Sequence, residues 1–286
     1  MLGKLMKYDM RSGFRKFALI WIGLAALGVI NGFTVKYVLD GENQNQLVNF
    51  FLGVLPMMLL VALYVAMGIF VLVFIVERFY KGLLGDEGYL MFTLPVTTSA
   101  HIGSKLLTGM IFAILSTLVA IVSGILLMLV LEPVGLREVI RAWSGMSAYL
   151  RDNPLPAGTG WVMAEFAVYT LVAMAAANLQ IYTAISIGHL AKKHRGGFAL
   201  LAYVGISIAI SVIVSSCFST LFRSDMFAHV TTYTWMFGID GSGTMTVQGV
   251  GAIAAALGVA LGLELLKGVG FFFATRAILS KRLNLE

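Results

Sequence analysis

Two long stretches without a charged side chain dominate the chain, and a short polar segment separates them. The first covers residues 47–76 and the second residues 106–131. A helix of about 20 apolar residues crosses the hydrocarbon core of a bilayer, so each stretch is long enough to span it. We therefore predict two membrane-spanning helices joined by a polar loop, residues 77–105.

The composition of the whole chain is also that of a membrane protein. Of 286 residues, 59% are apolar and 12% are charged, whereas soluble domains have about 45–50% and about 25%. We expect an all-α fold and one transmembrane domain, residues 1–286, with six spans. The predicted spans are residues 17–38, 48–76, 106–131, 161–190, 197–222 and 247–273. Cys217 is the chain's single cysteine, which excludes an intrachain disulfide.

Two further segments have the pattern of amphipathic helices. If residues 1–16 form a helix, their cations lie on one face and their apolar side chains cover much of the other. This pattern predicts a helix in the membrane interface. The loop 132–160 contains a narrow apolar stripe, and we expect a helix there that lies on the outer membrane face or caps the bundle. The stripe consists of Leu136, Val139, Ile140, Trp143, Met146 and Leu150.

The distribution of cations predicts the orientation in the membrane. With six spans both termini lie on the same side as the loop 77–105. Fifteen of the 20 Lys and Arg residues fall on that side, and cytoplasmic loops carry the excess of such cations. Both termini are therefore expected in the cytoplasm. The same rule accounts for the net charge of +6, so we expect no nucleic-acid partner.

Few polar residues lie in the predicted spans. Glu264 and Lys267 are three residues apart near the cytoplasmic end of span 247–273, where they can pair and extend toward the interface. Asn178 and Gln180 are separated by 200° around a helix, so both cannot face one pore, and we expect one to bond a neighbouring helix. All four are candidates for a transport pathway or for helix packing.

Several glycines have the spacing of close helix contacts. Gly28 and Gly32 form a Gly-x-x-x-Gly pair in span 17–38, and this spacing lets two helices approach closely. Gly251, Gly258 and Gly262 suggest the same for span 247–273. In a chain with 31 glycines such spacings also arise by chance.

We find no pattern of catalytic residues. The chain lacks the His-Glu-x-x-His and Gly-x-x-x-x-Gly-Lys-Ser/Thr motifs, and its four histidines are scattered. Gly85–Asp86 matches part of an intramembrane aspartyl protease motif, but no second Asp lies within a span. We therefore expect that the chain is not an enzyme and holds no metal or cofactor itself.

The loop 77–105 contains a short apolar segment. Glu77 and Lys81 can continue the preceding helix as an i,i+4 pair, and Gly82 and Gly85 allow it to break. A short helix can follow from Asp86 and must stop before Pro95. Such a short helix is not stable alone in water, so it either folds back on its own bundle or fills a groove in a cytosolic partner.

The loop resembles the coupling loop of ABC-2 type permeases, the membrane subunits of ABC exporters. The matching features are Glu87–Gly88, a hydrophobic turn at residues 89–92, Leu94–Pro95–Val96, a small polar stretch at residues 97–99, and Ile102–Gly103–Ser104–Lys105–Leu106–Leu107. In that family the loop docks into the ATP-binding subunit. The resemblance implies that the contact residues are Asp86, Glu87, Tyr89, Leu90, Met91, Phe92 and Leu94.

The resemblance also implies an assembly and a cargo. Two permease copies, identical or different, would associate with two ATP-binding subunits, which hold the ATP and Mg²⁺. The run Gly85–Pro95 is most similar to exporters of antimicrobial or toxin peptides from Gram-positive bacteria, such as those for phenol-soluble modulins. We thus expect a bacterial plasma-membrane exporter of amphipathic peptide or lipid-like cargo. The alternatives are a stand-alone secondary transporter and a membrane scaffold or sensor that recruits a cytosolic protein.

Overall fold

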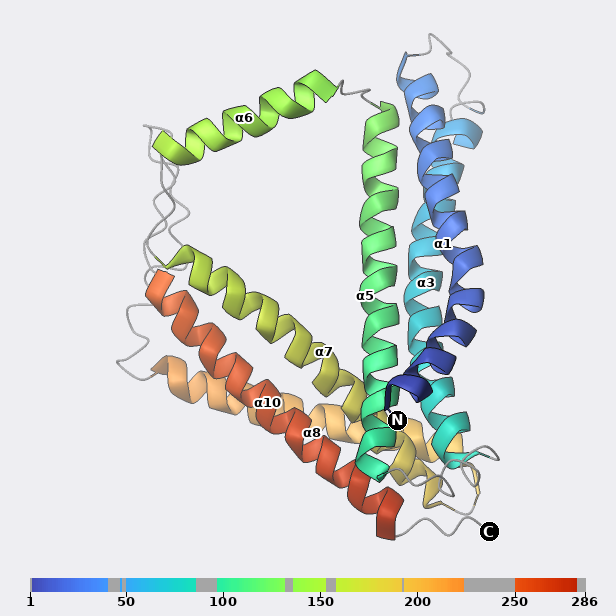
Figure 1. Cartoon of the computed structure of the whole chain (residues 1–286), viewed down its shortest axis with the longest axis vertical. Coiled ribbons are helices and arrows are strands. Elements are labelled where there is room, and N and C mark those ends of the chain that lie inside the picture. Colours follow the sequence, from blue (N-terminus) through green and yellow to red (C-terminus); the bar gives the residue numbers. More distant parts are fainter. Residues whose placement is uncertain are drawn as a thin grey trace. The chain divides into compact units, whose positions relative to one another are not determined.

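The computed structural model describes most of the chain, and this part is built from helices (Figure 1). The described residues are 2–40, 47, 50–85, 97–131, 136–152, 158–191, 193–223 and 250–281. Their α-helices are α1 (Leu2–Asp40), α3 (Leu55–Phe79), α5 (Thr98–Leu131), α6 (Leu136–Asp152), α7 (Thr159–His189), α8 (Arg195–Arg223) and α10 (Val250–Lys281). Two π-helical turns, Phe50–Val54 and Tyr80–Leu84, directly precede and follow α3.

Six of these helical segments are long and apolar enough to cross a membrane, which confirms the predicted all-α, six-span fold. The candidate spans are Met6–Val38, Phe50–Leu84, Thr98–Val130, Thr159–His189, Arg195–Cys217 and Ile253–Ser280.

Four helices continue past the apolar runs from which they were predicted. α1 is uninterrupted across the boundary expected at residue 16. α5 begins at Thr98, before the apolar run 106–131, as expected from the capping residues Thr97, Thr98 and Ser99. α3, which carries most of the uncharged run 47–76, continues through the π-turn to Leu84, and the last helix extends to Lys281. Ion pairs stabilise three of these extensions, those of α1, α3 and α5, because Asp9, Glu77, Arg78 and Lys105 find partners of opposite charge.

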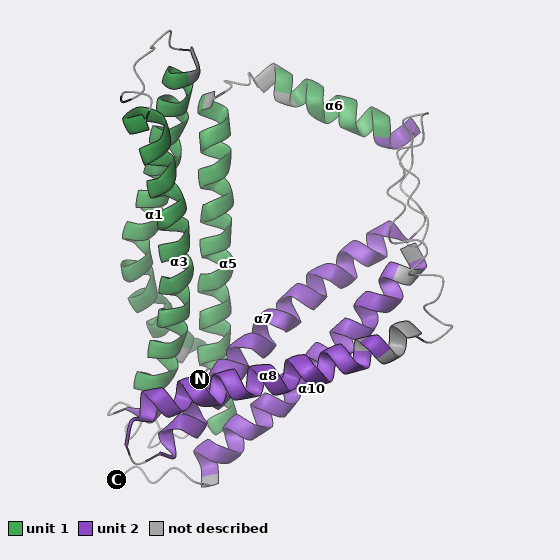
Figure 2. Ribbon diagram, turned by 180° about the vertical axis from the view of Figure 1, so that it is seen from behind, with its two compact units in different colours: residues 1–83, 92–149 green, residues 84–91, 150–286 purple. Residues whose placement is uncertain are grey.

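The chain divides into two compact units (Figure 2). The first contains α1, α3 and α5 with most of α6, and the second contains α7, α8 and α10. In the first unit α1 packs against both α3 and α5, and in the second α7 packs against both α8 and α10. In the first unit α3 also packs against α5.

Aromatic side chains form the core of the first unit. Phe17 of α1, Phe74 of α3 and Phe112 of α5 are buried together. The Phe17 and Phe112 rings are stacked with their centroids 4.8 Å apart. Gly13 makes room for this cluster, because a Cβ built there would come within 2.3 Å of Phe112 Cζ. Burying aromatic rings of this kind stabilises a helix bundle through contact area and ring geometry.

At Gly28 and Gly32 α1 lies close to α5, as the Gly-x-x-x-Gly spacing predicted. A Cβ added to Gly28 would lie 2.6 Å from the backbone oxygen of Ser123, and one added to Gly32 would lie 2.5 Å from Val130 Cβ. The hydroxyl of Ser123 donates a hydrogen bond of 2.7 Å to the carbonyl of Leu24. Such a bond needs the short distance between backbones that glycine permits.

Polar side chains join the helices of the second unit. Thr183 of α7 donates to its own helix at Leu179, and its hydroxyl lies 2.9 Å from the hydroxyl of Thr275 on α10. Gly188 lies against Ala199 of α8, with 2.5 Å between a built Cβ and the Ala199 nitrogen. These contacts hold α7 to its two neighbours at fixed register.

The glycines of α10 only partly behave as predicted. A Cβ on Gly258 would meet the Glu165 carboxylate of α7 at 3.1 Å, whereas no heavy atom of the described residues lies within 4 Å of a Cβ built on Gly251 or Gly262. Gly268, which the spacing argument did not include, instead lies 3.5 Å from Ala176 Cβ by the same measure. The expectation was wrong for Gly251 and Gly262 because spacing alone does not show which side of a helix meets a neighbour.

The amphipathic helix expected in the loop 132–160 is present as α6. The part of its apolar stripe whose side chains are described is exposed, and Trp143 retains 75% of its accessible surface. Ile140 and Met146 are exposed as well. An exposed apolar stripe on an otherwise charged helix is typical of a helix that lies in the membrane interface.

This placement of α6 predicts opposite environments for two positions on it. A spin label at Met146→Cys should be accessible to oxygen dissolved in lipid, while one at Ala148→Cys, on the other side of the helix, should be accessible to a water-soluble relaxation agent. Both labels require a Cys217→Ser background, and accessibility is measured by electron paramagnetic resonance in vesicles. Equal exposure of the two labels to the aqueous agent would exclude an interfacial position.

Candidate functional site at the base of the loop between α3 and α5

The structure describes both ends of the loop that the sequence singled out. The first end runs through the π-turn Tyr80–Leu84 to a bend at Gly85, where the sequence predicted a break. The second begins at Thr97, whose carbonyl accepts from the N–H of Ala100 at the start of α5. The predicted partner-binding residues lie outside the described residues; these are Asp86, Glu87, Tyr89, Leu90, Met91, Phe92 and Leu94. Both the docked and the folded-back arrangement therefore stay predictions.

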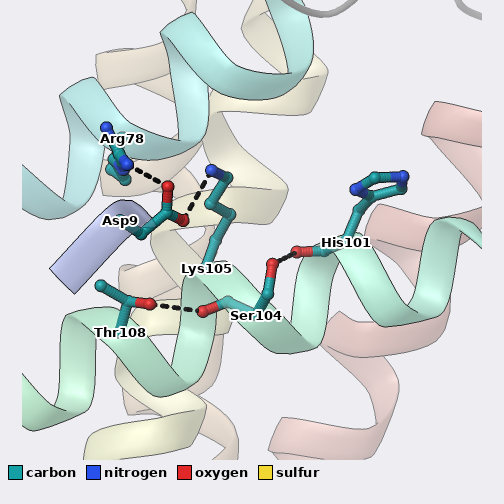
Figure 3. A network of polar contacts seen from close by, with 6 residues as sticks. All are labelled: Asp9, Arg78, His101, Ser104, Lys105 and Thr108. Atoms are coloured by element: carbon teal, nitrogen blue, oxygen red, sulfur yellow. Dashed lines mark hydrogen bonds and ion pairs between the residues drawn. The ribbon is translucent and has the colours of Figure 1, made fainter. Parts of the chain in front are cut away.

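A buried carboxylate joins the two ends of the loop to α1 (Figure 3). Asp9 is 4% exposed and Lys105 is 3% exposed. The Lys105 ammonium donates to Asp9 Oδ2 at 2.8 Å, and the Arg78 guanidinium donates to Asp9 Oδ1. Arg78 lies in the last turn of α3 and Lys105 in the second turn of α5. One carboxylate on α1 thus contacts the helix that enters the loop and the helix that leaves it.

The chemistry of this cluster makes it sensitive to displacement. Each carboxylate oxygen accepts a charge-assisted hydrogen bond, which is stronger than a neutral one. A buried pair that is broken leaves a charge without compensation and costs about 3–5 kcal/mol. A force on the loop that moved α3 relative to α5 would therefore act on α1 as well.

The surroundings of Lys105 are shaped to bury its long side chain. A Cβ on Gly82 would lie 3.0 Å from Lys105 Cε, so glycine leaves the space that the lysine stem occupies. On α5 the hydroxyl of Ser104 donates to the carbonyl of His101, and the hydroxyl of Thr108 donates to the carbonyl of Ser104 (Figure 3). The hydroxyls of Ser104 and Thr108 thus form their hydrogen bonds within α5.

A second, exposed ion cluster lies beside the first. Glu77 is 2.6 Å from Lys81 on the same helix and 3.3 Å from Lys16 of α1. The pairing of Glu77 with Lys81 is the one expected from their spacing. Exposed pairs contribute about 1 kcal/mol or less, so the buried Asp9 cluster dominates the link between α1 and the loop.

Sequence reasoning missed Asp9, although a signal for it exists. Asp9 is an acidic residue among cations, and it lies four residues before Gly13 and eight before Phe17. These spacings place all three on one face of a helix, and the structure buries that face against α3 and α5. Lys105 entered the sequence argument only as part of the family motif.

The four polar span residues predicted as pathway or packing groups all lie in the second unit. Gln180 Nε2 donates to Ser207 Oγ of α8 at 2.7 Å, as expected for one member of the amide pair. Asn178 is buried, and its Nδ2 has no hydrogen-bond partner among the described residues. Glu264 and Lys267 pair at 2.6 Å.

The Glu264–Lys267 pair lies near the middle of helix α10. The part of this helix that is long and apolar enough to cross a membrane is Ile253–Ser280. At 1.5 Å per residue, Glu264 is roughly 16 Å from Ile253 and Lys267 is roughly 20 Å from Ser280. The helix continues beyond residue 273, where the predicted span ends, and its last turns contain Arg276 and Lys281. The depth of the pair in the membrane stays a prediction.

The geometry gives no sign of a metal centre in the described part of the chain, where no three His, Cys, Asp or Glu side chains come together. No protein-family model, curated protein or solved structure matches the chain.

Proposed function

We propose that the chain is the membrane subunit of an ATP-driven exporter and that ATP is hydrolysed in a separate subunit. Three observations support this proposal. The chain has six helices of membrane length. Its loop between α3 and α5 carries the residues that resemble an ABC-2 coupling loop. The observation that carries the proposal is the Asp9 cluster, which ties both ends of this loop to α1.

The proposed mechanism follows from this cluster. ATP binding in the partner would move the loop, and the loop would carry the adjoining ends of α3 and α5 with it. Asp9 would transmit the displacement to α1, since α1 shares its carboxylate with both helices. The close glycine contact between α1 and α5 would make these two helices move together. Tilting them would open a path for amphipathic or lipid-like cargo.

The proposed assembly has two permease copies, identical or different, and two ATP-binding subunits that hold ATP and Mg²⁺. The complex would lie in a bacterial plasma membrane, with both termini in the cytoplasm. An apolar path suits an amphipathic toxin or antimicrobial peptide, because a strongly polar solute would leave its own groups without hydrogen bonds there.

The proposal predicts that the double variant Leu90→Asp/Phe92→Asp loses its ATP-binding subunit. Burying two carboxylates in an apolar cleft is too costly for docking to persist, whereas membrane insertion should be unchanged because both positions lie outside the spans. Co-purification of the ATP-binding subunit with the tagged chain measures the outcome. Thr97→Asp, nearby but outside the predicted contact set, serves as the control. Undiminished co-purification of the double variant would refute the docking assignment.

A stand-alone secondary transporter is the second candidate, and one observation favours it. Such transporters need ionisable groups near mid-membrane, and Glu264 and Lys267 lie near the middle of α10. Purified chain reconstituted in vesicles separates the two candidates. Transport under an ion gradient without ATP indicates the secondary transporter, whereas transport that requires the ATP-binding subunit and ATP indicates the exporter. A scaffold or sensor would bind a cytosolic protein and transport nothing in either assay.

A further inference from the structure

A groove in the second unit lies along helix α7, between α8 and α10. Its volume is ≈ 560 Å³, within the range of about 300–1,000 Å³ that is usual for small-molecule sites. All of its lining residues fall within the candidate membrane spans of the three helices. Its apolar wall residues include Ile206, Ile210, Ile213, Leu263, Leu266 and Phe271. The groove therefore belongs to the apolar part of this unit.

The groove is long and narrow. Tyr169 and Thr183 of α7 both line it, so at 1.5 Å per residue it extends for roughly 21 Å along the helix. Ala260 and Ala274 of α10 have the same separation, and Thr275 beside Ala274 contacts Thr183, so the two helices give the same length. Dividing the volume by this length gives a mean width of roughly 5–6 Å.

These dimensions match a single hydrocarbon chain. Carbon atoms in van der Waals contact are about 3.5–4.0 Å apart, so the width accommodates one chain and not two side by side. An extended chain advances about 1.25 Å per carbon, as follows from tetrahedral C–C bonds of about 1.52 Å, so roughly 17 carbons match the length. An α-helix with its side chains is about 10–12 Å in diameter. A helical peptide, or a helix of a second copy of the chain, is therefore too wide to enter.

The polar residues that line the groove do not select a charged occupant. Glu264 and Lys267 pair at 2.6 Å, so together they carry no net charge. The hydroxyl of Thr183 donates to Leu179 and lies 2.9 Å from the hydroxyl of Thr275. An apolar space of this kind stays free of water, and left empty it deprives its walls of van der Waals contacts. Hydrocarbon is the filling that satisfies both conditions.

We propose that this groove binds one straight hydrocarbon chain of a membrane lipid, about 16–18 carbons long, with the lipid head group outside the groove. Recognition depends on the length and width of the chain and not on the charge of the head group. This inference goes beyond the proposed function, because it assigns a lipid site to the chain itself, whichever energy source drives transport.

The test uses the purified full chain in digitonin, a detergent whose rigid steroid body is too wide for the groove. Radiolabelled 1-palmitoylglycerol, a neutral lipid with one straight sixteen-carbon chain, is the probe. We expect saturable binding of one probe per chain, above its partition into empty micelles. Absence of a saturable component would overturn the proposal.

A branched probe tests the width of the groove. 1-Phytanoylglycerol has the same head group and the same chain length, but methyl branches widen its chain. It should bind about tenfold more weakly or worse, because a well-packed site does not accept added methyl groups without strain. Equal saturable binding of the two lipids would refute recognition by shape.

Two tryptophan variants of α8 test the position of the site. Ile210→Trp fills the groove and should abolish saturable binding of 1-palmitoylglycerol. Ile208→Trp is the matched control, since Ile208 is 60% exposed and does not line the groove, and it should leave binding unchanged. The same effect of both substitutions on binding would contradict the assignment of the probe to the groove.

A charge-free variant tests the role of the ion pair. Glu264→Gln/Lys267→Met removes both charges with little change in volume, so it should bind the probe as well as the unmodified chain does. Loss of binding would mean that the pair, and not the shape of the groove, holds the lipid. Circular dichroism and gel filtration establish whether each variant is folded. If Ile210→Trp is not, the comparison of the straight and branched lipids on the unmodified chain decides the question.

The binding assay contains neither ATP nor an ATP-binding subunit. It is therefore independent of the transport and co-purification experiments of the proposed function, and either proposal can fail alone.

Discussion

Replacing Asp9 with asparagine is expected to lower the free energy of unfolding by about 3–5 kcal/mol, as for other buried ion pairs that lose one member. Asparagine has nearly the size of aspartate, so the loss reflects charge and not a cavity. Arg78 and Lys105 would lose the anion that they share, and Lys105 is too deeply buried to be hydrated in place. Unfolding of the purified chain in mixed detergent micelles measures the effect.

Two further variants isolate the cause of that loss. Glu77→Gln removes the exposed pairs beside the cluster and should cost about 1 kcal/mol or less. The double variant Asp9→Asn/Lys105→Met should recover part of the stability lost in Asp9→Asn, because it removes the buried cation together with its anion. An Asp9→Asn protein no less stable than Glu77→Gln would mean that the buried cluster does not hold the three helices together.

The substitution Gly28→Leu should destabilise the chain by about 3 kcal/mol or more, at the upper end of the range for overpacked sites. Even the first added carbon would lie 2.6 Å from the backbone oxygen of Ser123. A backbone atom cannot rotate away as a side chain can, so α1 and α5 must separate. The hydrogen bond from Ser123 to Leu24 would lengthen with them. The same unfolding measurement in mixed micelles detects this loss.

Gly124→Ala is the matched control for this contact. Gly124 follows Ser123 on α5, and a Cβ built there meets no heavy atom within 4 Å in the described part of the chain. Alanine is a better helix former than glycine by up to about 1 kcal/mol, so this variant should be neutral or slightly stabilised. Comparable destabilisation by Gly28→Leu and Gly124→Ala would show that the helix contact through Gly28 does not determine stability.

The local pattern of the sequence was sufficient to predict the long helices of this protein and the ion pairs within them. Uncharged stretches of membrane length predicted the six long helices, because burying charge in hydrocarbon is costly for any fold. Spacing along one helix also predicted the pairing of Glu264 with Lys267 and of Glu77 with Lys81, since residues three or four apart are neighbours on a helix surface.

Contacts between helices were harder to predict from the sequence. The Gly28–Gly32 spacing indicated a close approach but not that α5 is the partner, and the same argument was wrong for Gly251 and Gly262. Asn178 and Gln180 were predicted to face different directions, with one of them bonded to a neighbouring helix. Only the packing of α8 on α7 shows that this residue is Gln180, which donates to Ser207.

The sequence by itself determined where apolar helices form, because that depends on composition over some 20 successive residues. Only the tertiary structure decided what their charged residues do. Asp9 lies 69 residues from Arg78 and 96 from Lys105, and the groove beside Glu264 is assembled from three separate helices. The spacing of residues along one helix contains no information about which other helix packs against it. The Asp9 cluster and the groove therefore form only when the helices pack.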